Sequence, residues 1–127
     1  MLLMVWNELE LLLRLVAGTA AGIAVGWERT KKQRAAGVRT FGLVGLGSAA
    51  AAAIFSEPGE RDAASRVVQG LVTGIGFLGA GVIVLRKQDS APIGLTTAAA
   101  IWVTAALGCA AGLGACGVII SSNIENT

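Results

Sequence analysis

Long apolar stretches separated by short polar segments predict membrane-spanning helices along this chain. Val67 to Leu85 carries no charge and is long enough, as a helix, to cross a hydrocarbon core of about 30 Å. Residues 91–120 are also uncharged but are too long for one span, so we expect a break at Gly112 to Gly114. The predicted helices run near Trp6 to Trp27, Val38 to Phe55 (closed by a Pro58-Gly59 turn), Arg66 to Leu85 and Leu95 to Ala111, with a short fifth segment reaching Ile124. The expected fold is an all-α polytopic membrane bundle of four or five transmembrane helices.

The composition favours a membrane protein over a soluble one. Of the 127 residues, 54% are hydrophobic and only 14% are charged, whereas about 25% charged residues are usual in a soluble domain. So few charges could not cover the surface of a soluble domain of this length. The chain has no His, which excludes a His general base, a His-ligated metal and a His-containing triad. We therefore expect one transmembrane domain over residues 1–127, with no enzymatic activity, no cofactor and no metal site.

The distribution of charge predicts the topology in the membrane. Most basic residues fall in two segments, 28–39 and 86–93, and the positive-inside rule places both loops in the cytoplasm. The segment 56–66 mixes acidic and basic residues and belongs on the opposite side, as does the N-terminus. Trp6 and Trp27 lie about 31 Å apart along a helix, the separation expected of two interfacial aromatic belts.

Glycines at four-residue spacing predict close contacts between helices. The rows are Gly18, Gly22 and Gly26, then Gly70 and Gly74, then Gly108 and Gly112. Because lipid gives no hydrophobic drive between helices, close backbone approach through small residues is a main source of helix association. We interpret these rows as packing faces within the chain. The alternative is a self-association interface, which would make the protein a homo-oligomer, with a dimer favoured.

The two halves of the chain show a possible internal repeat. Gly37-Val-Arg-Thr40 and Gly94-Leu-Thr-Thr97 each open a predicted helix after a basic loop. A real repeat would relate two parallel helix pairs by an axis along the membrane normal. The alternative is that helices rich in Gly, Ala and Val resemble one another by chance.

Two groups of charged residues are candidate functional sites. Glu10 and Arg14 lie one turn apart on the glycine face of the first helix and can form an intramembrane ion pair, either structural or part of an ion relay. The second group comprises Glu28, Arg29, Arg39 and Thr40. It converges on the start of the second helix, where free N–H groups and the helix dipole favour an anion such as a lipid phosphate or a partner's carboxylate. The alternative is that these charges only set the topology.

The remaining polar groups in the spans have two interpretations. Gln69, Thr96 and Thr97 are further candidates for a functional or partner-binding role, and the alternative, which we favour, is that they bond to backbone carbonyls or to neighbouring helices. Cys109 and Cys116 lack the spacing of a metal site or a redox motif, so we interpret them as small buried hydrophobes that require no disulfide.

Several ordered motifs closely resemble the MgtC/SapB family of bacterial inner-membrane proteins. They are Arg66-x-x-Gln69, Gly74-Ile-Gly-Phe-Leu-Gly-Ala-Gly-Val-Ile83 and Gly94-Leu-Thr-Thr-Ala-Ala-x-Ile-Trp-Val-Thr-Ala-Ala-x-Gly108, preceded by Gly26-x-Glu-Arg29 and Ala36-Gly-x-Arg-Thr40. The resemblance covers about residues 10–114. The motif residues it carries over are Gly26, Glu28, Arg29, Gly37, Arg39, Thr40, Gln69, Gly74, Gly76, Gly79, Gly81, Thr96 and Thr97.

The resemblance implies a five-helix plasma-membrane protein linked to adaptation to low Mg²⁺ and to survival of pathogens inside macrophages. It also implies a non-enzymatic modulator that binds other membrane proteins, including the proton-translocating ATP synthase. Many members continue into a cytosolic C-terminal domain that this sequence does not include. The alternative function is a transporter of Mg²⁺, protons or a small solute, formed by an oligomer. The expected partners are the lipid bilayer, a second copy and another membrane protein, and no nucleic acid.

Overall fold

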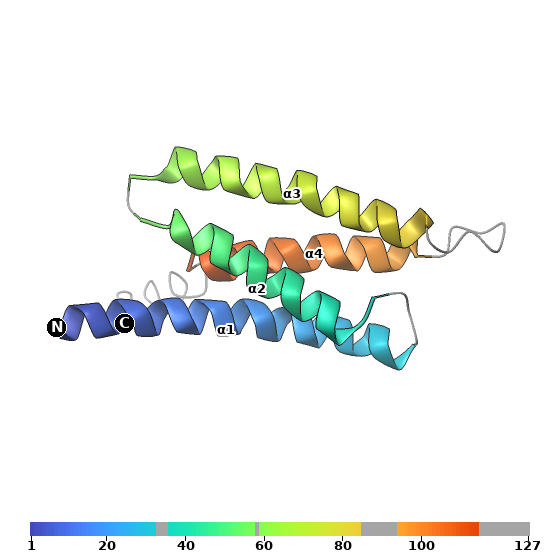
Figure 1. Ribbon diagram of the computed structural model, residues 1–127, viewed down its shortest axis with the longest axis horizontal. Coiled ribbons are helices and arrows are strands. Elements are labelled where there is room, and N and C mark those ends of the chain that lie inside the picture. The colour runs from blue at the N-terminus through green and yellow to red at the C-terminus, as the bar shows by residue number, and fades with distance from the viewer. Residues whose placement is uncertain (33–35, 58, 85–93, 115–127) are drawn as a thin grey trace, which may run out of the picture.

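In the part of the chain that the structure describes, four helices run up and down to form one elongated bundle (Figure 1). The computed structural model describes residues 1–32, 36–57, 59–84 and 94–114. The helices are α1 (Leu2–Lys31), α2 (Val38–Ile54), α3 (Arg61–Val84) and α4 (Leu95–Gly112). Because successive helices are antiparallel, α1 and α3 end where α2 and α4 begin. We call this the basic end of the bundle, since it carries Arg29, Lys31 and Lys32.

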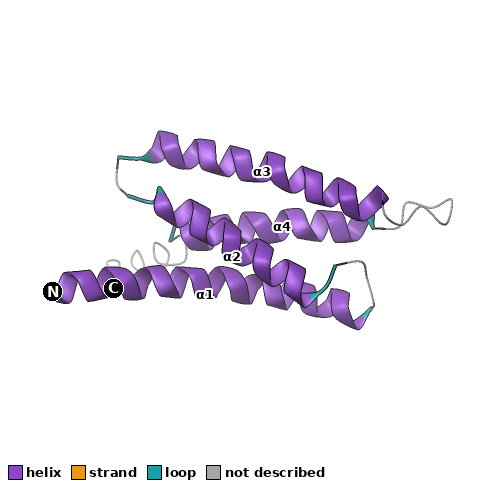
Figure 2. Cartoon of the chain, in the orientation of Figure 1, coloured by secondary structure: helices purple, strands orange, loops and turns teal. Residues whose placement is uncertain are grey.

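The expected all-α membrane bundle is confirmed. Every regular element in the described part of the chain is a helix (Figure 2). By length and composition, α1, α3 and α4 could each cross a membrane, and α2 is a shorter apolar helix of 17 residues. The fifth segment that we expect up to Ile124 lies outside the described residues.

Two helices extend beyond their expected bounds. Helix α1 runs from Leu2 to Lys31 instead of Trp6 to Trp27, and α3 begins at Arg61 instead of Arg66. Charged residues end the apolar part of a span, but they do not end a helix, because Arg, Lys and Glu are good helix formers. Only a turn stops α3 on its N-terminal side, where Gly59 has a φ of 102°.

Three of the described helices contact one another, and α3 packs mainly against α4. Helices α1, α2 and α4 contact one another, whereas α3 contacts α4, touches α2 at few positions and does not reach α1. The two halves run in the parallel directions expected of the possible repeat. Their packing is not symmetric, because a two-fold arrangement would pack α3 against α2 as closely as α1 packs against α4.

The core lies among all four helices of the described part of the chain, and its buried cluster includes Ile75 of α3. Its largest fully buried side chains include Phe41 on α2 and Ile101 on α4, with exposed fractions of 0% and 1%. Val25 of α1 packs against this cluster. Phe41 lies directly over Gly26, where a Cβ atom would stand only 2.7 Å from the Cβ of Phe41. Gly26 therefore makes the space that the Phe41 side chain occupies.

Glycine rows on α1 and α4 contact the backbone of α2. A Cβ on Gly22 would lie 2.1 Å from the carbonyl oxygen of Phe41, and a Cβ on Gly112 would lie 2.2 Å from that of Ala49. Gly18 and Gly108 face Gly45 in the same way. Since real Cβ atoms do not approach other atoms this closely, these positions admit only glycine without a shift of the helices.

The row on α3 differs from our expectation of packing within the chain. A Cβ on Gly70 or Gly74 would meet no atom within 4 Å, and the same holds for Gly76 and Gly81. Of the α3 glycines in the described part of the chain, only Gly79 approaches another helix, with its Cβ position 3.4 Å from the Cβ of Ala98. The Gly70–Gly74 row therefore lies on an open surface of the bundle.

Candidate functional site

Arg14 joins three elements at the end of the bundle opposite the basic end. One guanidinium nitrogen, Nη1, donates hydrogen bonds to Ser56 Oγ at 2.8 Å and to the backbone oxygen of Gly112 at 3.1 Å. The other, Nη2, pairs with the carboxylate of Glu10. Gly112 ends α4, so Arg14 both satisfies a terminal carbonyl and places a positive charge at the negative end of that helix. This arrangement holds the ends of α2 and α4 against α1.

An open groove of about 570 Å³ surrounds the Arg14 cluster. Its lining includes the carboxylates of Glu8, Glu10 and Glu57, with Arg14 as its cation. Among the described residues, no group of three His, Cys, Asp or Glu side chains is arranged to hold a metal ion. The groove can attract cations through its net negative charge, without the geometry of a metal site.

Arg14 lies near the end of the bundle at which α2 and α4 end, and its expected position inside the membrane stays a prediction. Its partners Ser56 and Gly112 lie just beyond α2 and at the last residue of α4. The first turns of α1 project past the other described helices, as Figure 1 shows. Residues 2–13 of this helix extend about 18 Å at the usual helical rise. They are exposed and mostly apolar.

The candidate anion group at the basic end is only partly assembled. Glu28 accepts a hydrogen bond from Lys32 at 3.0 Å and lies 3.9 Å from the guanidinium of Arg29. The Arg29 side chain is mostly buried, and its Nε atom has no hydrogen-bond partner among the described residues. Arg29 Nε is therefore a buried donor that the described residues leave without an acceptor.

Thr30, a residue of α1 that the sequence analysis does not single out, caps the start of α2. Its hydroxyl accepts the backbone N–H of Val38 at 2.8 Å, so one of the donors that we expect to bind an anion is already satisfied. Arg39 is exposed, and Thr40 lines a groove between α2 and α3. The signal that could have found Thr30 is the preference of Thr for bonding to a free helix N–H.

Polar residues within the helices take different positions. Thr97 is 2% exposed, and Thr104 is fully buried with its hydroxyl bonded to the backbone oxygen of Ala100 at 2.8 Å. Thr96 and Gln69 are exposed, and the Gln69 amide donates to Ser65 Oγ on its own helix. Local bonding of hydroxyl groups is the usual solution in apolar helices.

Comparison with known proteins agrees with the class that the fold defines, a small polytopic α-helical membrane protein. The match to the MgtC family covers residues 15–124. The chain is 43% identical over 114 residues to the Escherichia coli K12 protein named "Putative magnesium transporter YhiD", which covers 83% of this chain and 52% of that protein. It is 43% identical over 118 residues to "Protein SrpB" of Synechococcus elongatus, with 84% of this chain and 65% of the relative covered.

The chain belongs to the MgtC family. It is also 42% identical over 103 residues to "Protein MgtC" of Salmonella typhimurium, with 81% of this chain and 43% of the relative covered. The chain thus spans about half the length of the MgtC and YhiD relatives that it matches. No solved structure matches it.

Proposed function

We propose that this chain is a non-enzymatic regulator of the bacterial plasma membrane that acts by binding other integral membrane proteins. The family resemblance suggests a role in adaptation to low Mg²⁺ or in survival inside macrophages. It also suggests the proton-translocating ATP synthase as the first partner to test. The positive-inside rule supports a cytoplasmic location for the basic end and an outside location for the Arg14 groove.

The closed interior of the bundle is the observation that carries this proposal. Helices α1, α2 and α4 meet through backbone atoms at Gly18, Gly22 and Gly112, where even one methyl group does not fit. The buried hydroxyl of Thr104 bonds to its own helix. Because these groups are already used in packing, the described helices offer another molecule their outer surfaces.

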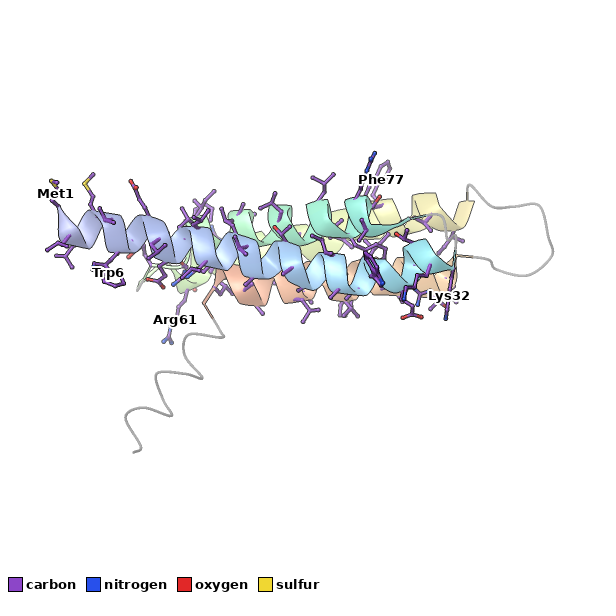
Figure 3. All side chains as sticks on the ribbon, turned by 90° about the horizontal axis from the view of Figure 1, so that it is seen from below. Met1, Trp6, Lys32, Arg61 and Phe77 are labelled. Atoms are coloured by element: carbon purple, nitrogen blue, oxygen red, sulfur yellow. The ribbon has the colours of Figure 1, made fainter. Side chains whose placement is uncertain are left out.

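The first turns of α1 are the outer surface best suited to a protein partner. They expose large apolar side chains, among them Trp6 at 63% and Leu12 at 56%. Figure 3 shows Met1 and Trp6 on the part of α1 that extends past the other described helices. An apolar helix that projects in this way presents the stripe by which one helix binds another.

Site-specific photo-crosslinking in native membranes tests this surface. A photoreactive amino acid at Leu9, which is 43% exposed in the projecting part of α1, should give one dominant adduct with an integral membrane protein. The matched control is Val103 on α4, which is 45% exposed and should not give that adduct. Equal adducts at both positions, or none at Leu9, would refute binding through α1.

Transport by an oligomer is the second candidate, and the acidic groove around Arg14 favours it. Glu8, Glu10 and Glu57 would concentrate cations at this end of the bundle. Purified protein in liposomes tests this function by the rate of Mg²⁺ or proton flux. A protein-dependent flux that Arg14→Leu abolishes would establish transport in place of regulation by binding.

A further inference from the structure

The outer side of α3 combines a projecting aromatic side chain with a row of open glycines. Phe77 is 82% exposed, and Figure 3 shows it pointing away from the bundle. Gly70 and Gly74 lie beside it on the helix surface and leave open space around the backbone. One face of α3 therefore combines an aromatic projection with a helix backbone that no side chain covers.

A mostly apolar groove runs between α2 and α3, on the side of the Gly70–Gly74 row that is opposite to Phe77. Its volume is about 390 Å³, and its lining includes Leu43 and Gly47 from α2 and Leu71, Ile75 and Leu78 from α3. A Cβ on Gly47 would meet nothing within 4 Å, so the wall of the groove has room for a side chain from outside.

Helical geometry places the glycine row between the aromatic side chain and the groove. At about 100° per residue, the order around α3 is Phe77, Gly70, Gly74, Leu78 and Leu71. Phe77 and the groove also lie at the same level along α3, because Phe77 falls between Ile75 and Leu78, which both line the groove. One surface of the chain therefore carries a projection and a matching recess at the same level.

We propose that this surface binds a second copy of the chain. Two copies of a membrane protein share one orientation, so a two-fold axis along the membrane normal leaves every residue at its own depth. With the axis beside Gly70 and Gly74, the Phe77 of each copy enters the α2–α3 groove of the other. The open glycines then let the two α3 backbones approach closely, as small residues do in membrane helix pairs.

Disulfide cross-linking tests the proposed contact directly. In a background with Cys109 and Cys116 replaced by Ala, a chain with Phe77→Cys and a differently tagged chain with Leu43→Cys are expressed together. Oxidation in the membrane should give a mixed dimer at least 10-fold more abundant than the control pair, in which Trp102→Cys replaces Phe77→Cys. Trp102 is 50% exposed and lies seven residues from the basic end of α4, as Phe77 does on α3.

A second measurement keeps the test independent of cysteine chemistry. The dimer fraction of purified protein in lipid vesicles is compared for Gly74→Leu and Gly76→Leu, two open positions on nearly opposite sides of α3. Gly74→Leu should weaken association at least 10-fold, while Gly76→Leu should leave it unchanged. Equal effects of both substitutions, a monomeric wild-type protein, or cross-linking no stronger than in the control pair would each overturn the proposal.

The dimer does not rest on the proposed regulatory function. It forms from purified chains through α3, whereas the regulatory proposal requires a different membrane protein at α1. If the chain forms the dimer but gives no adduct at Leu9, only the regulatory proposal is rejected. If the chain gives the adduct with its partner but is monomeric, only the dimer is rejected.

Discussion

The contact between α1 and α2 at Gly22 gives the sharpest test of how the bundle is held together. In Gly22→Ala the new Cβ would lie 2.1 Å from the carbonyl oxygen and 2.8 Å from the carbonyl carbon of Phe41, and 3.1 Å from the Cα of Gly42. All three are backbone atoms, so no side-chain rotation can relieve the clash. The two helices must therefore separate by about 1 Å, a gap that forfeits up to about half of each van der Waals contact along the interface.

The size of the effect follows from two opposing terms. Overpacking of this kind costs about 1–3 kcal/mol, and we expect the upper end here because only backbone can move. The better helix propensity of Ala offsets about 1 kcal/mol. Gly22→Ala should therefore lower the free energy of unfolding by about 2 kcal/mol.

Gly76→Ala is the matched control, because a Cβ there meets nothing within 4 Å. It should be neutral or more stable than the wild type by up to about 1 kcal/mol. The assay is unfolding by SDS in mixed micelles, followed by tryptophan fluorescence. If the two variants differ by less than about 1 kcal/mol, the backbone contact at Gly22 does not hold α1 against α2.

Three further substitutions test other contacts by the same unfolding measurement. Arg14→Gln should lower stability by about 1.5–3 kcal/mol through loss of charged hydrogen bonds to two elements, and a neutral result would mean that those bonds do not hold the end of the bundle. Thr30→Val should cost about 0.5–1.5 kcal/mol by leaving the Val38 N–H without its acceptor, while Thr30→Ser retains stability. Phe41→Ala should cost about 3–5 kcal/mol because the side chain is fully buried, and a much smaller loss would place the core elsewhere.

The candidate site shows where sequence reasoning reaches its limit. The i, i+4 spacing of Glu10 and Arg14 brings them onto one face, and the two side chains are paired in the structure. The other partners of Arg14 are 42 and 98 residues away in the chain, so no local pattern could indicate them. Glu28 and Arg29 lie next to each other, as neighbours in the sequence must. Thr40, which we expect in the same group, instead lines the α2–α3 groove, and this groove exists because α3 touches α2 at few positions.

The amino-acid sequence alone determines that this is an all-α membrane protein of the MgtC family, with helices near the four long apolar stretches. Span length and hydropathy are local properties, set by the thickness of the bilayer and by the cost of placing charges in it. Only the tertiary structure decides which glycine rows are used inside the chain. Gly22 and Gly112 meet the backbone of α2, and Gly70 and Gly74 remain open. All four glycines belong to rows with the same four-residue spacing. The placement of whole helices decides which of them contact another backbone.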